Sequence, residues 1–450
     1  HTRLRCVTGV QTLLFRSQKN REHSPYLNWY CNVNFYGNNE YNDGFSYDNW
    51  GGYNLLVKLN QRNPDVQNYI CDVIRYWVSE FDVDGIRLDA ADVLDFDFMR
   101  MLRRTAEEVK PDFWLMGEVI HGDYSRWVNG ETLHSVTNYA LHKALYSGHN
   151  DHNYFEIAHT VKYLQNMGNL DLYNFVDNHD VERIYTKLSN KAHFTPVHIL
   201  LYTLPGIPSI YYGSEFGIEG RKERSSDDSL RPALSLDDYE TALGDNPCTA
   251  LIAALGQIRQ HTPALSYGSY AELHLTNRQF AFARDLNDVR VVVTVNNDDN
   301  AASMDLPSGN ATEYIGALSG QKAAVQDGHI NVTVPANSGE IWVPDGDMPE
   351  YKPFKIEISV KEETVTDEES IPADSEEPSA AAEPVHFDPN KSPEDMSVAE
   401  LHAAILTKMA NNGPVTDQMQ KTVNENIWHD SLVNWLRVSV DILFSLRQYI

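Results

Sequence analysis

The residues best suited to chemistry begin in residues 84–92, which run Asp-Gly-Ile-Arg-Leu-Asp-Ala-Ala-Asp. The middle of this stretch is typical of a β-strand, in which side chains alternate between two faces. Ile86 and Leu88 then share one face, and Arg87 and Asp89 share the other. A neighbouring cation lowers a carboxyl pKa by roughly one to three units, and an ionised, oriented carboxylate can act as a nucleophile. A lone Arg-x-Asp is more often an inert surface ion pair.

Two further acids follow predicted strands. Glu118 ends the apolar segment 113–117, and Asp180 comes after the buried segment 172–176. The carboxyl ends of parallel strands meet at one rim of a barrel, where such enzymes keep their catalytic groups. Taken singly, Glu118 would be a strand-end salt bridge and His179 a structural histidine. Their joint occurrence with Asp89 favours a functional site.

Strands and helices alternate in the part of the chain that must position these acids. Asn63 and Pro64 are typical of a helix start, and an apolar stripe at helical spacing follows them to residue 78. Alternation of this kind predicts a parallel α/β barrel of the TIM type. The expected strands are 84–89, 113–119, 134–140, 172–176 and 207–212, and the later expected helices are 96–109, 154–167, 192–204 and 248–260.

After Pro263 the helical patterns give way to short segments of alternating polarity, such as 280–284, 290–296 and 329–334. These segments predict the strands of an antiparallel β domain of the sandwich type. The acidic, Pro- and Ser-rich residues beyond it predict a disordered linker. A capping box at Ser397 then predicts a small helical module. The expected domains are an unassigned start at 1–16 that resembles translated adapter sequence, a barrel at 17–262 with a loop excursion at 20–55, a β domain at 263–344, a linker at 345–393 and a helical module at 394–450.

The composition of this 450-residue chain limits the classes of partner that it can bind. Its formal net charge of -28 argues against nucleic acid and anionic membranes, which both require basic surface. An uncharged, hydroxyl-rich ligand is compatible with this charge. The four cysteines lack the spacing of a disulfide framework or a metal ribbon, and no apolar run is long enough to cross a bilayer. We therefore expect a cytoplasmic protein, with its oligomeric state left open.

Five segments together resemble the α-amylase family of glycoside hydrolases, over about residues 22–344. The first of them resembles the motif of the neopullulanase and cyclomaltodextrinase branch, and the last resembles the family's final barrel strand. In chain order they are Lys58-Leu59-Asn60, Asp84-Gly85-Ile86-Arg87-Leu88-Asp89, Gly117-Glu118-Val119, Phe175-Val176-Asp177-Asn178-His179-Asp180 and Gly206-Ile207-Pro208-Ser209-Ile210-Tyr211-Tyr212-Gly213-Ser214-Glu215.

The resemblance implies a role for each residue that matches a family motif. Asp89 would be the nucleophile, Glu118 the general acid and base, and Asp180 the acid that holds the sugar hydroxyls. Arg87 would orient Asp89, and His179 would bond the same sugar. A retaining glycosidase of this kind needs two carboxyl groups roughly 5 to 5.5 Å apart.

The two reacting carboxyl groups must also differ in pKa, because one attacks while the other donates a proton. We therefore expect Glu118 to lie away from Arg87 and close to apolar side chains. Met116, on the same side of the strand, and Trp114 are the candidates for this apolar surface.

Several positions depart from the family pattern. The neopullulanase branch typically has Trp where this chain has Ile120, and an Asn-Glu pair within the segment that here is 90–93. The Asn-His motif of the third strand does not occur, so we expect a barrel truncated at its N-terminus and lacking its first strands. The preference among pullulan, cyclodextrin and linear dextrin stays open. No cofactor is required, no metal ligand is assigned, and calcium, common in relatives, is compatible but not indicated.

Two hypotheses remain. The first is a retaining hydrolase that cleaves α-1,4-glucosidic bonds in maltodextrins or related α-glucans, with glucose transfer as an extension of the same chemistry. The alternative is a catalytically inactive glucan-binding relative or an inactive fragment. For the tail alone, the helical pattern predicts a protein-docking module.

Overall fold

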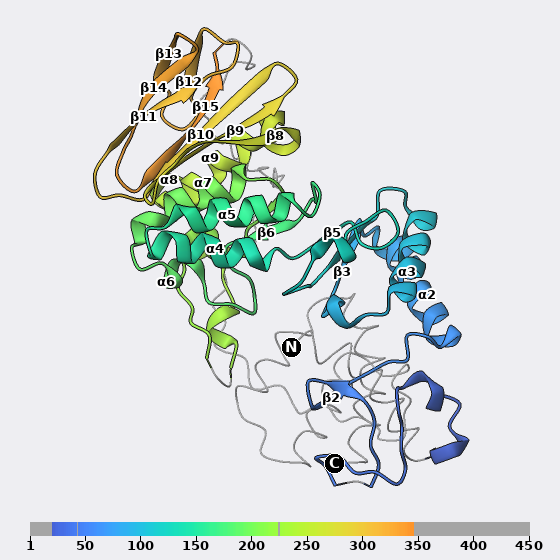
Figure 1. Ribbon diagram of the computed structural model, residues 1–450. Helices are drawn as coiled ribbons and strands as arrows, with labels where there is room; N and C mark the ends of the chain where they lie inside the picture. The colour runs from blue at the N-terminus through green and yellow to red at the C-terminus, as the bar shows by residue number, and fades with distance from the viewer. Residues whose placement is uncertain (1–19, 43, 224–225, 346–450) are drawn as a thin grey trace, which may run out of the picture. The chain divides into compact units, whose positions relative to one another are not determined.

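The computed structural model describes residues 20–42, 44–223 and 226–345 (Figure 1). These residues fall into two compact units, 20–66 and 67–345, which are considered separately below. The unassigned start at 1–16, the helical module at 394–450 and all but the first residue of the expected linker lie outside the described residues.

The unit of residues 20–66 is built mainly of turns around a small aromatic core. A short antiparallel pair, β1 (Asn49–Trp50) and β2 (Tyr53–Val57), is its regular part. Tyr30 and Phe45 are buried at its centre. Asparagine side chains fix the turns, as where the Asn39 amide donates to the Phe45 carbonyl at 3.0 Å.

Five parallel strands form the part of the second unit that carries the predicted acids. They form two groups, one in the order β3-β4-β5 and one pairing β6 with β7, and a single backbone bridge between Thr137 and Tyr173 connects the groups. This arrangement is the parallel wall expected of an α/β barrel. The strands are β3 (Gly85–Leu88), β4 (Trp114–Gly117), β5 (Ser135–Val136), β6 (Tyr173–Phe175) and β7 (Ile207–Ser209).

Helices follow these strands in the expected alternation, and several of them begin at a side-chain cap. The carboxylate of Asp95, for example, accepts hydrogen bonds from the backbone of Asp97 and Phe98 at the start of α3. The α-helices are α2 (Pro64–Phe81), α3 (Phe96–Val109), α4 (Tyr139–Asn150), α5 (Tyr154–Gln165), α6 (Ile184–Lys187), α7 (Phe194–Thr203), α8 (Ala242–Asp245), α9 (Pro247–His261) and α10 (Pro263–Tyr267).

One predicted element is largely wrong. The strand expected over 134–140 is reduced to the two residues of β5, and helix α4 follows almost at once. Asn138 explains the change, because its side chain accepts from the backbone of Leu141 at 3.1 Å and starts the helix. The predicted strand 134–140 therefore extended past Asn138, the residue at which the helix begins.

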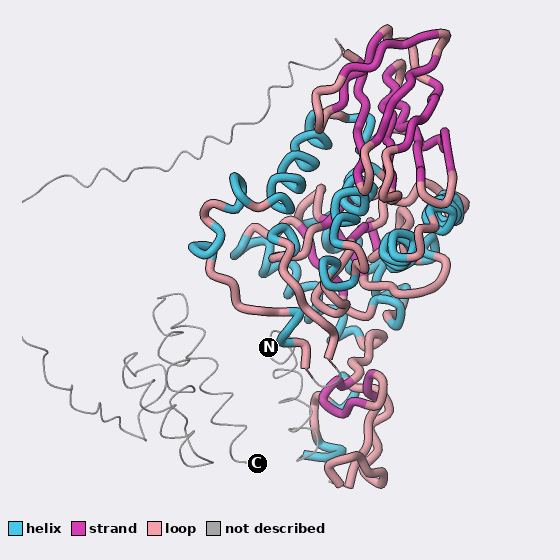
Figure 2. The backbone as a smooth tube through the Cα atoms, turned by 90° about the vertical axis from the view of Figure 1, so that its left-hand side faces the viewer, coloured by secondary structure: helices cyan, strands magenta, loops and turns pink. Residues whose placement is uncertain are grey.

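The C-terminal part is an antiparallel sheet in the order β11-β14-β13-β12-β15-β10-β9-β8, drawn in magenta in Figure 2. One face of β9, β10 and β15 packs on helices α4, α5, α7 and α9, while the opposite face closes a second core around Trp342. The strands are β8 (Ser269–Leu275), β9 (Gln279–Leu286), β10 (Val289–Asn296), β11 (Ala302–Pro307), β12 (Glu313–Gly316), β13 (Lys322–Gln326), β14 (His329–Val334) and β15 (Ser338–Pro344).

Within the described residues, no helix is both long and apolar enough to cross a membrane. The same residues contain no cluster of three or more His, Cys, Asp or Glu side chains arranged to hold a metal ion.

Candidate active site

The register of β3 and β4 determines where two of the predicted acids lie. Leu88 pairs with Gly117 in this parallel ladder, and Asp89 and Glu118 are the next residue of each strand. The Glu118 backbone N–H donates to the Leu88 carbonyl at 2.9 Å, so the ladder continues to this level. Adjacent strands lie about 4.8 Å apart, and the two acids therefore leave the sheet side by side at its carboxyl end.

Arg87 contacts both of these carboxylates. Its Nη1 lies 2.9 Å from Asp89 Oδ1, and its Nη2 lies 3.0 Å from Glu118 Oε2. The expectation that Glu118 lies away from Arg87 is therefore wrong. The parallel register puts the two carboxylates next to each other, and the planar guanidinium fork can serve two acceptors at once.

Glu118 is nonetheless shielded from solvent, as expected, and the contribution of Met116 and Trp114 to that shielding stays a prediction. Its side chain is 11% exposed, against 55% for Asp89. Met116 is buried two residues earlier on β4, and Trp114 packs against Tyr173 with ring centroids 6.2 Å apart. The difference in exposure gives the two carboxyl groups distinct environments.

The backbone after β3 closes over Glu118. Ala90 has left-handed dihedrals, with φ of 46°, which cost an L-residue roughly 1–2 kcal/mol. In this conformation its N–H donates to Glu118 Oε2 at 3.2 Å, and the Ala91 N–H donates to the Glu118 carbonyl at 2.8 Å. Gly117 permits this approach, because a Cβ there would meet the Ala91 methyl at 2.7 Å.

Asp180 lies in the loop after β6, and its carboxylate contacts the side chains of His179 and Arg231. His179 Nε2 lies 3.1 Å from Asp180 Oδ2, and Arg231 Nη2 lies 2.8 Å from Asp180 Oδ1. Arg231 also donates to the His179 carbonyl at 3.0 Å and pairs with Asp227 at 2.9 Å. Both predicted site residues of this loop are thus held by one arginine from a distant segment.

Buried groups anchor the same loop from below. Asp177 accepts hydrogen bonds from the Ile184 backbone and from the Ser214 hydroxyl, both at 2.7 Å. Its burial raises the pKa of its carboxyl to about 6. Arg183 is fully buried and donates to the Ser214 hydroxyl at 3.0 Å and to the Leu230 carbonyl at 2.9 Å. The loop that presents Asp180 therefore has fixed ends.

Tyr139 connects the two halves of the site. Its hydroxyl accepts a hydrogen bond from Asn178 at 3.1 Å. Burial raises the pKa of Tyr139, and the negative charges of Glu118 and Asp180 raise it further. Arg87 thus joins Asp89 to Glu118, and Tyr139 lies near enough to Glu118 and Asp180 to feel the charges of both.

The sequence did not single out Arg231, Tyr139 or Asp177 as site residues. Asp177 lay inside a quoted motif, and its position at the end of a buried strand was the available signal. Tyr139 follows the Asn138 cap that was taken for strand. Arg231 sits in an aperiodic segment, 51 residues after its partner Asp180, and no local pattern points to the pairing.

A model of the α-amylase catalytic domain matches residues 8–247, which is more than half of the chain. The chain belongs to the α-amylase family. The resemblance found from the motifs is thereby confirmed, and the parallel strands with a C-terminal antiparallel sheet are the α-amylase barrel fold with its β domain.

Individual relatives point to one branch of this family. A cyclomaltodextrinase of Thermoanaerobacter pseudethanolicus is 31% identical over 249 residues, covering 54% of this chain and 42% of the relative. Neopullulanase 2 of Thermoactinomyces vulgaris is 28% identical over 297 residues, covering 64% and 49%. A solved cyclomaltodextrinase matches with a TM-score of 0.66 at 24% identity, covering 74% and 57%, and shows the shared fold. The chain spans about half the length of the curated relatives it matches.

Proposed function

We propose that this site hydrolyses α-1,4-glucosidic bonds with retention of anomeric configuration. The observation that carries the proposal is the Arg87 fork, which holds Asp89 and Glu118 together at the ends of adjacent parallel strands. Retaining glycosidases need two carboxyl groups roughly 5 to 5.5 Å apart, and neighbouring strands supply a spacing of that order.

In the first step Asp89 attacks the anomeric carbon while Glu118 protonates the glycosidic oxygen, and the leaving sugar departs. Asp89, the more exposed carboxylate, forms the covalent glycosyl ester. Water, deprotonated by Glu118, then attacks the same carbon and frees Asp89. Because Arg87 pairs with Glu118 in the structure, the substrate must displace this contact before Glu118 can carry its proton.

Asp180 and His179 would hold the hydroxyl groups of the reacting sugar. Their side chains lie 3.1 Å apart, from His179 Nε2 to Asp180 Oδ2, and Arg231 contacts the other oxygen of the Asp180 carboxylate. A charged acceptor with a fixed rotamer binds a pair of hydroxyls at low entropic cost. We assign substrate binding to Asp180 and His179, and orientation of Asp89 to Arg87.

The substrate class follows from the relatives rather than from the geometry. Relatives named cyclomaltodextrinase, neopullulanase and maltogenic α-amylase match the chain. We therefore propose maltodextrins and related α-glucans as substrates. A further relative is named intracellular maltogenic amylase, and it supports a cytoplasmic location as a proposal that cell fractionation would test.

The test is release of reducing sugar from maltoheptaose. We expect Asp89→Asn to lower the rate by about a thousandfold or more, since it removes the nucleophile. Asp92→Asn is the matched control, because Asp92 is an exposed acid of the same segment, and it should retain the rate. Proton NMR of the fresh product should show the α-anomer first.

Three results would oppose the proposal. Undiminished turnover by Asp89→Asn would reject the assigned nucleophile, and a β-anomer as first product would reject retention. Binding of maltoheptaose without any product from the unsubstituted chain would instead support the glucan-binding alternative.

A further inference from the structure

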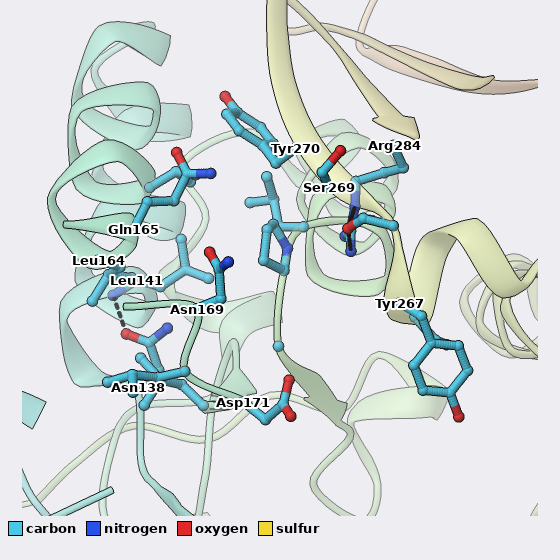
Figure 3. A pocket seen from close by; sticks show the side chains of 18 residues that line it. Asn138, Leu141, Leu164, Gln165, Asn169, Asp171, Tyr267, Ser269, Tyr270 and Arg284 are labelled. Atoms are coloured by element: carbon cyan, nitrogen blue, oxygen red, sulfur yellow. Dashed lines mark hydrogen bonds between the residues drawn. The ribbon is translucent and has the colours of Figure 1, made fainter. Parts of the chain in front are cut away.

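A cavity of about 570 Å³ lies at the opposite end of the strands from the predicted acids. Its walls come from the end of α5, the segments that lead into β6 and β7, and the start of β8 (Figure 3). Asp171 lies two residues before β6 begins, whereas Asp180 lies five residues after β6 ends. The cavity is therefore separate from the candidate active site.

Its size fits a small-molecule ligand. Ligand pockets in proteins typically measure roughly 300–1,000 Å³ and combine apolar walls with a few polar groups. Here Tyr270 supplies a half-buried ring, and Tyr267 at the margin is 80% exposed. Aromatic side chains of this kind offer a flat apolar face and a polar tip.

Three polar side chains of the wall have unused hydrogen-bonding capacity. Among the described residues, the half-buried Gln165 and the exposed Asn169 and Asp171 make no side-chain hydrogen bond, and they lie around the same open space in Figure 3. The hydroxyl of Tyr270 is buried and also has no hydrogen-bond partner among the described residues. A buried hydroxyl such as that of Tyr270 normally has a partner, whereas Asn169 and Asp171 are open to solvent.

The charges of the wall exclude an anionic ligand. Arg284 is its one cation, and its guanidinium already donates to the Thr203 carbonyl at 2.6 Å and to the Gly268 carbonyl at 2.9 Å. Asp171 would repel a phosphate or carboxylate. Two amides, a carboxylate and a hydroxyl offer both donors and acceptors, which suits a neutral ligand with many hydroxyl groups.

We infer that this cavity is a second sugar-binding site, in which Gln165, Asn169 and Asp171 bind the hydroxyls of a neutral oligosaccharide beside the Tyr270 ring. The identity of the sugar rests on the proposed function, which makes a short α-glucan the natural ligand. This site would hold a glucan chain without cutting it, because the wall lacks a second carboxyl group next to Asp171.

The probe is maltotriose, added to the full chain carrying Asp89→Asn so that turnover does not consume it. Hydrogen–deuterium exchange reports the place of binding. We expect saturating maltotriose to slow exchange at least threefold in residues 165–172 and 269–271. Asn169→Leu should abolish this protection, whereas Asn166→Leu, an exposed residue at the end of α5 outside the wall, should retain it.

Gln165→Leu provides an independent second test from the last turn of α5, and it should also abolish the protection. The inference is overturned if residues 165–172 exchange equally fast with and without maltotriose. It is also overturned if Asn169→Leu and Gln165→Leu both keep full protection. If the unsubstituted chain hydrolyses maltoheptaose but maltotriose does not slow exchange in residues 165–172, only the second sugar-binding site is rejected. If maltotriose slows exchange there but the unsubstituted chain does not hydrolyse maltoheptaose, only the proposed function is rejected.

Discussion

At the level of single residues, Arg87 does more than orient one carboxylate. It lies between Asp89 and Glu118 and contacts both within 3.0 Å. A planar fork with several donors holds its two acceptors in fixed directions, whereas the ammonium group of a lysine sits on a flexible stem. The proposed division of labour between the two carboxyl groups therefore depends on the guanidinium shape as well as on its charge.

Replacing Arg87 by Lys tests this dependence. The ammonium group of lysine lacks the fixed fork that orients Asp89, and losing the charge-assisted hydrogen bond to Asp89 costs about 1.5–3 kcal/mol. We expect kcat/KM on maltoheptaose to fall roughly 10- to 100-fold at an unchanged melting temperature. Arg75→Lys is the control, since Arg75 forms exposed pairs with Asp72 and Glu108. Equal kinetics for both variants would contradict the proposed role of the fork.

Arg231 is the second arginine whose contacts predict a kinetic effect. It fixes the carboxylate of Asp180 and the backbone of His179, the two residues proposed to hold the sugar. Arg231→Gln should raise KM for maltoheptaose about tenfold, the equivalent of a hydrogen bond to a charged group, and should change kcat less. Arg221→Gln, at an exposed position in the same segment, should leave KM unchanged. A normal KM in Arg231→Gln would remove this positioning role.

At the level of elements, buried histidines on the helices of the second unit make its stability depend on pH. Burial lowers the pKa of His142 to about 4, of His149 to about 3 and of His198 to about 4, all from 6.5. The folded state therefore binds fewer protons than the unfolded state. Stability is lost as pH falls below about 6.5 toward these values, by about 1.4 kcal/mol per pH unit for each histidine.

Urea unfolding at pH 7.5 and pH 5.5 checks this dependence. We expect a clearly lower free energy of unfolding at pH 5.5, and a smaller loss in His149→Gln than in the unsubstituted chain. Asp177 acts in the opposite direction, because its raised pKa of about 6 favours the folded state as pH falls. His159→Gln is the control at an exposed position on α5, and it should keep the full loss. Stability independent of pH would contradict the argument.

The sequence predicted elements well where period and caps agreed. Asn63 with Pro64, the stripe that ends before Pro111, and the buried strand before Asp177 all gave elements close to those observed. It did not predict α4, because the short strand β5 and the helix cap Asn138 lie within four residues of each other. Local patterns cannot resolve so abrupt a change.

For the site, the strand-end acids followed from the sequence, but their contacts did not. The link between Arg87 and Glu118 depends on the register of two strands, and the link between Arg231 and Asp180 joins segments 51 residues apart. Such pairings follow from tertiary packing and leave no periodic trace in the sequence.

At the level of the whole molecule, the β domain and the helices share one core. Phe280 on β9 is fully buried and packs on Tyr154 of α5, with ring centroids 6.1 Å apart. Phe280→Ala should lower the free energy of unfolding by about 3–5 kcal/mol. Phe155→Ala, at a half-exposed position on α5, should change it by less than about 1 kcal/mol.

Tryptophan fluorescence and far-ultraviolet circular dichroism should follow the same urea transition in Phe280→Ala, because the shared core couples the two parts. Two separate transitions would show that the sheet unfolds independently, and the shared core would then carry no coupling.

The two groups of parallel strands are paired only at the backbone bridge between Thr137 and Tyr173, so the described wall is paired more weakly there than within each group. β3 and β4 are joined by a four-residue ladder that ends at the two acids, so Asp89 and Glu118 stay side by side. Asp180 belongs to the far side of that bridge. An opening of the wall at this bridge would move Asp180, the proposed sugar-binding acid, away from Asp89 and Glu118. It would release the proposed product without separating the two proposed reacting carboxylates from each other.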